Sequence, residues 1–285
     1  FDLEHWFTPA SIDTEPFDVV SQDRCTLTLT KEMQLKNYSG SSFDLRVDRD
    51  VRVLQAVEIA AALGVEPMPA VKMVGFETRN VMVNTGTRPW RKETGLLSIW
   101  ILGMFNPSPE TTVVVPFVAG EEAALGPIVN DAYFGKVPEE RLIAGDGVLF
   151  FSGDGQYRSK IGLSPMRAKS VLGSYDASRK MLTIVQYNKP SSARDYVNSM
   201  WEMQDEPYRG DVVNSYNDGP PAPEEEPLGP FYELETSSPA VSLGVGGSIT
   251  HMHRTMHLTG PETALDPIAR RLLGVGIDDI TSAMQ

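Results

Sequence analysis

Hydrophobic and polar residues alternate along many short segments of this chain, and this two-residue period is the feature that most limits its fold. Alternation of this kind is typical of β-strands that bury one face. The segments end at Gly, Pro, Asn or Asp residues. The predicted strands are 25–31, 43–54, 71–83, 96–105, 111–118, 148–151, 159–163, 180–187 and 211–217. We therefore expect a mainly β, predominantly antiparallel sandwich.

Two segments show a helical period instead. Residues 54–63 carry apolar side chains at helical spacing and are followed by Gly64, a common helix stop. Near the C-terminus, Asp266 precedes Pro267, which is typical of an N-cap and a first helical position, and Gly274 ends the run. We expect a few short helices at the periphery of the sandwich.

The chain is long and apolar enough to bury a large core. It has 285 residues, of which 41% are hydrophobic, and no Pro-, Ser- or Gly-rich run is long enough to be a linker. We expect one domain over residues 1–285, with room for upstream N-terminal strands that precede Phe1 in a longer chain. No apolar run reaches the roughly 18 residues of a membrane span.

Charge and cysteine content narrow the class of partner. The formal net charge of −13 disfavours a nucleic-acid backbone or an anionic membrane surface as the main partner, whereas a neutral sugar is compatible with it. Cys25 is the only cysteine, so neither an internal disulfide nor a cysteine metal site is expected. No cofactor and no metal are assigned, and the sequence does not fix the oligomeric state.

Two late segments, 229–243 and 247–258, alternate in the same way on either side of a Gly-rich interval, so we expect them to pair as a hairpin. In the first segment, Glu233 and Glu235 lie on one face. In the second, His251, His253 and His257 share a face. The pairing predicts a cluster of histidines beside two carboxylates.

These late segments also carry a family resemblance. Residues 231–236, with their Leu-Glu-Thr, and residues 243–255 resemble the late strand pair of the aldose 1-epimerase, or galactose mutarotase-like, superfamily. The whole chain is still more similar to an uncharacterised family of bacterial, often Bacteroidetes, proteins of mutarotase-like fold, through segments 12–17, 210–220 and 229–235. The resemblance implies a β-supersandwich with a sugar-facing surface, and it suggests a periplasmic or secreted location.

The resemblance further implies roles for individual residues. The epimerases use a carboxylate on the Leu-Glu-Thr strand as general base toward the anomeric hydroxyl, and the matching residue is Glu235. They use a mid-chain histidine as general acid at the ring oxygen, but this chain has no histidine between His5 and His251. The comparable strand ends at Tyr187 and Lys189, so the acid would be one of these or come from another strand.

Further polar candidates are grouped around Glu235. Glu233 and His253 are expected to support the acid/base chemistry. The expected substrate-binding residues are Arg209, Asp211, Asn214 and His251, with Trp6 and Trp90 as stacking surfaces in polar, loop-like contexts. Arg158 and Lys160 follow a glycine-containing segment that we interpret as a hairpin turn, and they have the option of facing the site.

Each feature also has a purely structural interpretation. Glu233 and Glu235 would form a solvated strand face or pair with Arg254. Two carboxylates on one face perturb each other's pKa strongly only when they are buried, so an exposed pair would carry no functional meaning. The histidines would be hydrogen-bonded polar residues rather than metal ligands. Asp211 and Asn214 would serve turn formation.

The sequence therefore predicts a carbohydrate-active protein with acid/base chemistry at an anomeric centre, either an aldose 1-epimerase-like isomerase or a glycoside-processing enzyme. The alternative is a non-catalytic carbohydrate-binding protein, which the absent mid-chain histidine favours. A third possibility is a structural domain of a larger assembly. The identity of the sugar is not fixed by the sequence.

Overall fold

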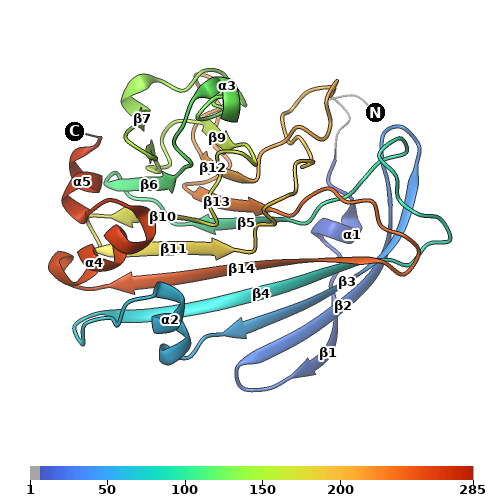
Figure 1. Cartoon of the computed structure of the whole chain (residues 1–285), viewed down its shortest axis with the longest axis horizontal. Helices are drawn as coiled ribbons and strands as arrows, with labels where there is room; N and C mark the ends of the chain where they lie inside the picture. Colours follow the sequence, from blue (N-terminus) through green and yellow to red (C-terminus); the bar gives the residue numbers. More distant parts are fainter. Residues whose placement is uncertain (1–6, 285) are drawn as a thin grey trace.

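The larger of two β-sheets contains ten strands in the computed structural model, which describes residues 7–284. Its neighbouring strands are all antiparallel. In order across the sheet they are β1 (Asp18–Gln22), β2 (Thr26–Lys36), β3 (Ser42–Val53), β4 (Lys72–Asn84), β14 (Ser248–Thr259), β11 (Met181–Tyr187), β10 (Val171–Asp176), β6 (Thr111–Pro116), β8 (Val148–Ser152) and β7 (Leu142–Ala144). Strands β1 to β4 form the lower part of the molecule in Figure 1.

The second sheet contains four antiparallel strands and packs on one face of the first. Its order is β5 (Trp100–Phe105), β13 (Tyr232–Ser237), β12 (Val213–Asn217) and β9 (Ser159–Leu163). Between the sheets lies a core to which both contribute, including Val113, Phe151, Leu172, Val185, Ile161, Val213 and Leu234. The alternating pattern of β13 sends Leu234 into this core, so its neighbours Glu233 and Glu235 point to the opposite, outer face of the small sheet.

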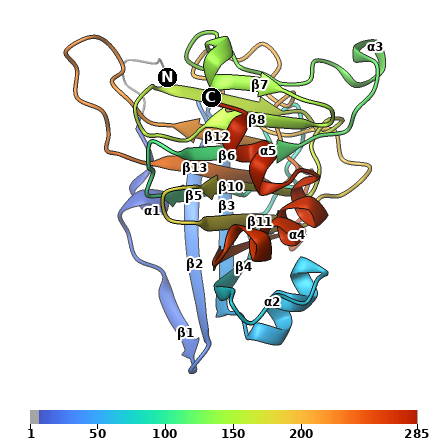
Figure 2. The ribbon, with the colours of Figure 1, turned by 90° about the vertical axis from the view of Figure 1, so that its left-hand side faces the viewer.

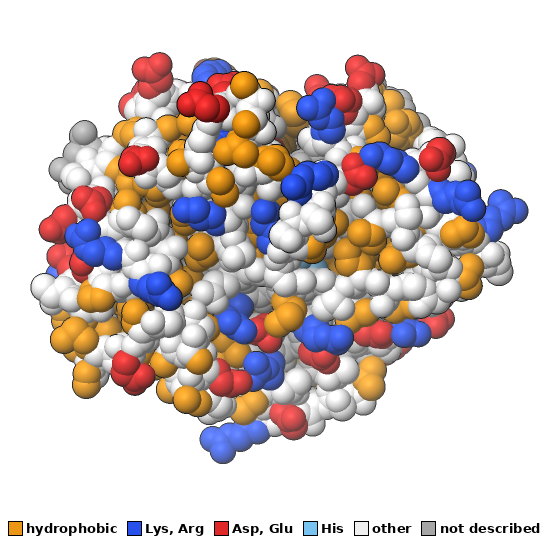
Figure 3. All heavy atoms as spheres, in the orientation of Figure 1, with side chains coloured by type: hydrophobic (Ala, Val, Ile, Leu, Met, Phe, Trp, Pro, Cys, Tyr) orange, Lys and Arg blue, Asp and Glu red, His pale blue; other side chains and the backbone are white. Residues whose placement is uncertain are grey.

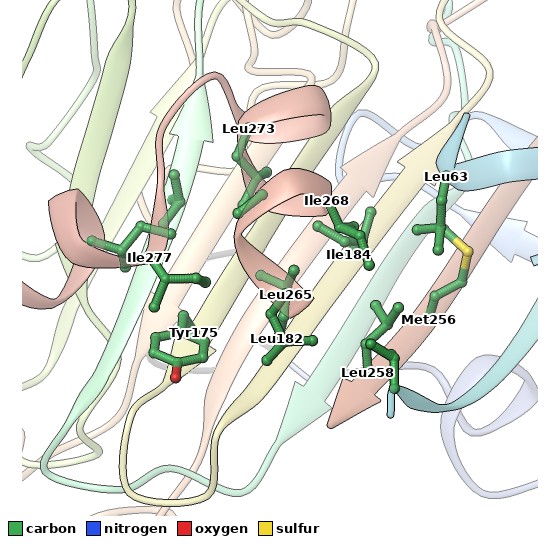
Figure 4. Packing of buried hydrophobic residues seen from close by; sticks show 14 of the residues in the cluster. Leu63, Tyr175, Leu182, Ile184, Met256, Leu258, Leu265, Ile268, Leu273 and Ile277 are labelled. Carbon is green, nitrogen blue, oxygen red and sulfur yellow. The ribbon is translucent and has the colours of Figure 1, made fainter. Parts of the chain in front are cut away.

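Short helices cover the other face of the large sheet. The described helices are α1 (Ala10–Asp13), α2 (Ala56–Leu63), α3 (Glu122–Leu125), the 3₁₀ turn η1 (Glu139–Arg141), α4 (Glu262–Leu273) and α5 (Ile277–Ser282). Figure 2 shows α2, α4 and α5 on one side of the large sheet. In Figure 4, Leu265 and Ile268 of α4 point onto Leu182 and Ile184 of β11, which gives the molecule a second core. No helix within residues 7–284 combines the length and apolar character that crossing a membrane requires.

Helix α2 begins and ends where the sequence indicates. The Glu58 carboxylate accepts a hydrogen bond from the Gln55 backbone N–H at 2.8 Å, and Gly64 closes the helix with a left-handed φ of 66°. The helix packs close to β4 because Gly75 has no side chain: a Cβ there would lie 3.3 Å from Ile59 and 3.1 Å from Met256. The early helix prediction is confirmed.

Three local predictions are wrong. The late segments do not form a hairpin, because β13 pairs with β5 and β12 in the small sheet whereas β14 pairs with β4 and β11 in the large one. The segment before Arg158 is not a hairpin turn, since it joins β8 of the large sheet to β9 of the small sheet. Helix α4 begins at Glu262 and contains Pro267 in its interior, so Asp266 is not its N-cap.

The fold class is confirmed. The protein is mainly β, with large antiparallel sheets and few short helices. Strands β1, β7 and β10 were not predicted, because β1 and β7 are only five and three residues long and β10 is interrupted by Gly173.

Candidate functional site

The candidate site is built on the outer face of the small sheet. Glu235 on β13 lies opposite Leu102 on β5 and opposite Asn214 on β12, and Asn214 in turn lies opposite Gly162 on β9. Because side chains two apart on a strand share a face, Glu233 and Lys160 belong to the same surface. The pleat of four strands thus gathers polar residues from distant parts of the chain.

Glu235 is the centre of this group. Its side chain is fully buried, and its Oε2 accepts hydrogen bonds from Trp100 Nε1 at 2.8 Å and Lys160 Nζ at 2.9 Å. The ammonium group also lies 4.8 Å from the centre of the Trp100 ring. Glu235 is therefore the carboxylate partner of a buried ammonium group. The other oxygen, Oε1, is buried and has no donor among the described residues unless a neighbouring carboxyl group carries a proton.

Glu233 is the neighbour that can carry this proton. Burial, the charge of Glu235 and a hydrogen bond to Glu235 raise the pKa of Glu233 to about 8, while the charge of Lys160 acts in the opposite direction. At neutral pH Glu233 is thus mainly a carboxylic acid, and it lies beside the carboxylate that pairs with Lys160. Two adjacent carboxyl groups in opposite protonation states are the arrangement that acid/base catalysis uses.

A third carboxyl group lies beside this pair. Asp211 accepts hydrogen bonds from the Tyr133 hydroxyl at 2.6 Å and from Asn130 Nδ2 at 3.1 Å, both from a loop over the small sheet. Asn214 donates to the same Tyr133 hydroxyl at 2.8 Å. Burial raises the pKa of Asp211, and these two hydrogen bonds and the charge of Lys160 oppose the rise. The cluster therefore offers fixed acceptors and donors of the kind that bind hydroxyl groups.

Trp100 provides the accessible surface of the site. Its side chain belongs to the edge strand β5 and is 42% exposed, whereas Glu233 and Lys160 are 7% and 6% exposed. An indole that is exposed on one side and bonded to a carboxylate on the other can stack on an apolar sugar face while holding the acid/base pair. A ligand would therefore approach from the β5 edge.

The histidines lie on the opposite side of the small sheet from the carboxylates. His251 Nε2 and His253 Nδ1 lie 2.8 Å and 2.9 Å from the hydroxyl of Thr236, which faces the interior between the sheets. Burial lowers the pKa of His251 to about 4 and that of His253 to about 3. Both are therefore neutral at pH 7, and the predicted cluster of histidines beside Glu233 and Glu235 does not form.

The remaining predicted residues are scattered. Arg209 is bonded to Glu206 at 2.9 Å through a side chain that is 75% exposed. Trp90 does not have the polar, loop-like surroundings that its sequence suggests, because it is 4% exposed and packs edge-on against Phe43. Trp6 lies outside the described residues. Tyr187, a candidate acid, is buried in the large sheet and donates to the Lys169 carbonyl.

Sequence reasoning missed one residue of the site, Tyr133, and undervalued two others, Trp100 and Lys160. Trp100 follows four apolar or small residues and resembles a core tryptophan, and Tyr133 lies in a segment without a regular pattern. The sequence indicates Lys160 only as an optional member of the site. The available signal was the strand 159–163, because alternation there places Lys160 opposite the core residues Ile161 and Leu163.

Metal binding has no support in the described part of the chain. No group of three or more His, Cys, Asp or Glu side chains within residues 7–284 is placed to hold a metal ion.

With this geometry established, comparison with known proteins identifies the family. The model of a family described as "Family of unknown function (DUF6786)" matches residues 1–284. The chain belongs to the DUF6786 family. No curated protein matches it in sequence.

Several solved structures resemble the fold. A "putative aldose 1-epimerase" from Klebsiella pneumoniae has a TM-score of 0.50 at 8% identity, with 91% of this chain and 57% of that protein covered. A galactose mutarotase-like protein from Lactobacillus casei has a TM-score of 0.46 at 10% identity, with 85% and 72% covered. The Slr1438 protein from Synechocystis has a TM-score of 0.45 at 9% identity, with 86% and 66% covered.

These likenesses bear on the fold and not on the reaction. At 8% identity, the Klebsiella structure supports a galactose mutarotase-like β-sandwich, and this chain spans little more than half of that protein. The family match leaves the function open, and none of these findings supports a Bacteroidetes origin. Any activity must therefore be argued from the site.

Proposed function

We propose that this protein binds a sugar at the outer face of the small sheet and catalyses proton transfer at its anomeric centre, as an aldose 1-epimerase-like isomerase. One observation carries the proposal: two adjacent carboxyl groups, Glu233 and Glu235, are buried on one face of the small sheet, and Glu235 is bonded to the Lys160 ammonium group while burial raises the pKa of Glu233. The mutarotase-like fold supports the choice of a sugar. The sequence resemblance to the epimerases assigns the base to Glu235.

The chemistry follows from the two oxygens bonded to the anomeric carbon. Glu235 takes the proton of the anomeric hydroxyl, and Glu233 gives its proton to the ring oxygen. The bond between the anomeric carbon and the ring oxygen breaks as the carbonyl double bond forms, which yields the open-chain aldehyde. After rotation about the adjacent carbon–carbon bond the ring closes: Glu233 takes back the proton it gave to the ring oxygen, and Glu235 returns its proton to the anomeric oxygen, so the cycle is balanced.

The neighbours of the pair fix which carboxyl group is acid and which is base. Lys160 and Trp100 both bind Oε2 of Glu235, which stabilises its negative charge and leaves Oε1 as the oxygen that exchanges a proton. In this mechanism Glu233 takes the place of the histidine that the epimerases use as general acid. The missing mid-chain histidine is then compatible with turnover.

The test is anomer exchange measured by NMR over a panel of aldoses and uronic acids. Wild type should accelerate exchange of at least one sugar, and Glu235→Gln and Glu233→Gln should each lower the rate by about 10²- to 10⁴-fold, the usual contribution of a positioned acid or base. Arg46→Gln is the control, since Arg46 pairs with Asp48 on the large sheet. Full exchange rates in both glutamine variants would refute the assignment.

A second function is favoured by the burial of Glu235, whose side chain has no solvent exposure. In this alternative the protein binds a carbohydrate without turning it over, and the Lys160–Glu235 pair is structural. It predicts saturable sugar binding with no acceleration of anomer exchange. Binding would then depend more on Trp100 than on the charge of Glu235.

A further inference from the structure

A second cation, Arg158, lies close to the acid/base pair. It precedes Lys160 by two residues, so alternation places both on the outer face of the small sheet, about 7 Å apart along the strand. Lys160 reaches Glu235 from there. Arg158 therefore lies one pleat repeat beyond Lys160, the residue that holds the proposed base Glu235, and this separation is within the span of one sugar ring and its substituents.

The guanidinium group of Arg158 is held by aromatic rings. Its central carbon lies 4.1 Å from the centre of the Phe134 ring, and Phe134 packs edge-on against Tyr216 with ring centres 5.7 Å apart. The hydroxyl of Tyr216 donates to Asp218 at 2.9 Å. Phe134 comes from the same loop as Tyr133, so the stacked group belongs to the wall of the site.

Among the residues that the structure describes, Arg158 has no carboxylate partner, and in this it differs from the other cations of the region. Lys160 pairs with Glu235 at 2.9 Å, and Arg141 pairs with Asp154 at 2.6 Å. Within residues 7–284, no Asp or Glu oxygen lies within 4.0 Å of the Arg158 guanidinium. Its side chain is hydrogen-bonded to the hydroxyl of Tyr216, which in turn donates to Asp218.

A guanidinium stacked face-on against a ring keeps the N–H groups of its edge, and these match the two oxygens of a carboxylate. A dedicated cation is also needed if an anion is to bind this chain, because the net charge of −13 repels anions. Figure 3 shows acidic side chains interspersed with basic ones over the surface in view, rather than one broad basic patch.

We propose that Arg158 binds a carboxylate on the substrate, so the sugar that this site takes is an acidic sugar such as a hexuronic acid. This inference rests on the proposed function and names its substrate class. The competing explanation is that Arg158 only anchors the loop through Phe134. In that case its removal would lower the affinity for acidic and neutral sugars equally.

The experiment is titration calorimetry of the full chain with matched pairs: glucuronate against glucose, and galacturonate against galactose. Wild type should bind one uronate at least 10-fold more tightly than its neutral partner. Arg158→Gln should lower uronate affinity by about 10- to 100-fold and leave neutral-sugar affinity unchanged, the usual range for a lost charged hydrogen bond. Arg158→Lys should retain part of the preference, and Arg46→Gln, with the same charge change on the large sheet, should retain all of it.

The outcomes separate the two proposals. If neutral sugars bind as well as the uronates and are turned over in a Glu235-dependent way, the acidic-sugar inference is overturned and the proposed function stands. If no sugar of either class binds, both are overturned. If Arg158→Gln weakens both classes equally while its thermal melt shows a folded protein, Arg158 is an anchor for the loop and the inference fails.

Discussion

Lys160 and Glu235 form an ion pair with almost no solvent contact: their side chains are 7% and 0% exposed. Removing one partner of such a pair leaves an uncompensated buried charge, which is more costly than removing both. We predict that Lys160→Met lowers the free energy of unfolding by about 3 to 5 kcal/mol at pH 7.

A double-mutant cycle checks this prediction by urea denaturation. Lys160→Met combined with Glu235→Gln should lose less stability than the sum of the two single variants, because Gln needs no counter-charge. Strict additivity would mean that the two side chains do not stabilise each other. That result would also remove the reason for assigning an ionised Glu235 to the base.

Tryptophan shows why burial is hard to predict residue by residue. Trp90 stands among Arg, Pro and Lys residues and suggests an exposed loop, but it is 4% exposed in a core with Phe43. Trp100 stands among apolar residues and is 42% exposed, because β5 is the edge strand of the small sheet. Local polarity carries no information about which strand becomes an edge.

At the scale of single elements, β9 shows how a strand makes room for a site residue. A Cβ on Gly162 would lie 2.1 Å from the Asp211 carboxylate oxygen and 2.6 Å from Asn214 Nδ2. We predict that Gly162→Ala displaces Asp211 and lowers the free energy of unfolding by about 1 to 3 kcal/mol, the usual cost of overpacking. Sugar affinity should fall with it.

Thermal melts and sugar titrations of Gly162→Ala check this prediction. Gly244→Ala is the matched control, since a Cβ there has nothing within 4 Å and φ is not in the left-handed region. Equal stability of the two variants would show that the Asp211 carboxylate moves without cost. It would then not be a fixed acceptor for sugar hydroxyls.

The pattern of single elements was largely readable from the sequence, whereas their pairing was not. Alternation identifies which residues of β13 share a face, and Glu233 with Glu235 is the pair found. It does not identify the neighbouring strand. The connection between β13 and β14 crosses from the small sheet to the large one. These two strands, which are consecutive in sequence, therefore face each other from different sheets and are joined by hydrogen bonds from Thr236 to His251 and His253.

At the scale of the whole molecule, the sandwich architecture was predictable because strand alternation is repeated along the chain, and few segments compete with it. The site was predictable only in part. Glu233, Glu235, Asp211 and Asn214 do come together, but their partners Lys160, Trp100 and Tyr133 arrive from β9, β5 and a loop. Their proximity depends on strand order across the sheet, which no local pattern encodes.

The buried titratable groups give the whole molecule a pH dependence of two opposite signs. The pKa of His251 and His253 is lowered in the fold to about 4 and about 3, so stability is present above pH 6.5 and is lost as the pH falls toward these values. The pKa of Glu233 is raised to about 8. Its contribution to the free energy of unfolding is therefore complete below pH 4.5 and is lost as the pH rises from there to about 8. Between pH 4.5 and 6.5 the gain from two histidines outweighs the loss from one carboxyl group. The free energy of unfolding should therefore be greatest near pH 6 to 7.

Urea denaturation from pH 4.5 to 9 measures both limbs. We predict a loss of about 2 kcal/mol per histidine between pH 7 and 5, since the unfolded histidines bind protons there and the folded ones do not. On the alkaline side, Glu233→Gln should flatten the decline between pH 6 and 8 and leave the acidic limb in place. If instead the acidic limb disappears in Glu233→Gln, or wild-type stability is flat from pH 5 to 8, the three groups do not have the protonation states on which the proposed acid/base pair depends.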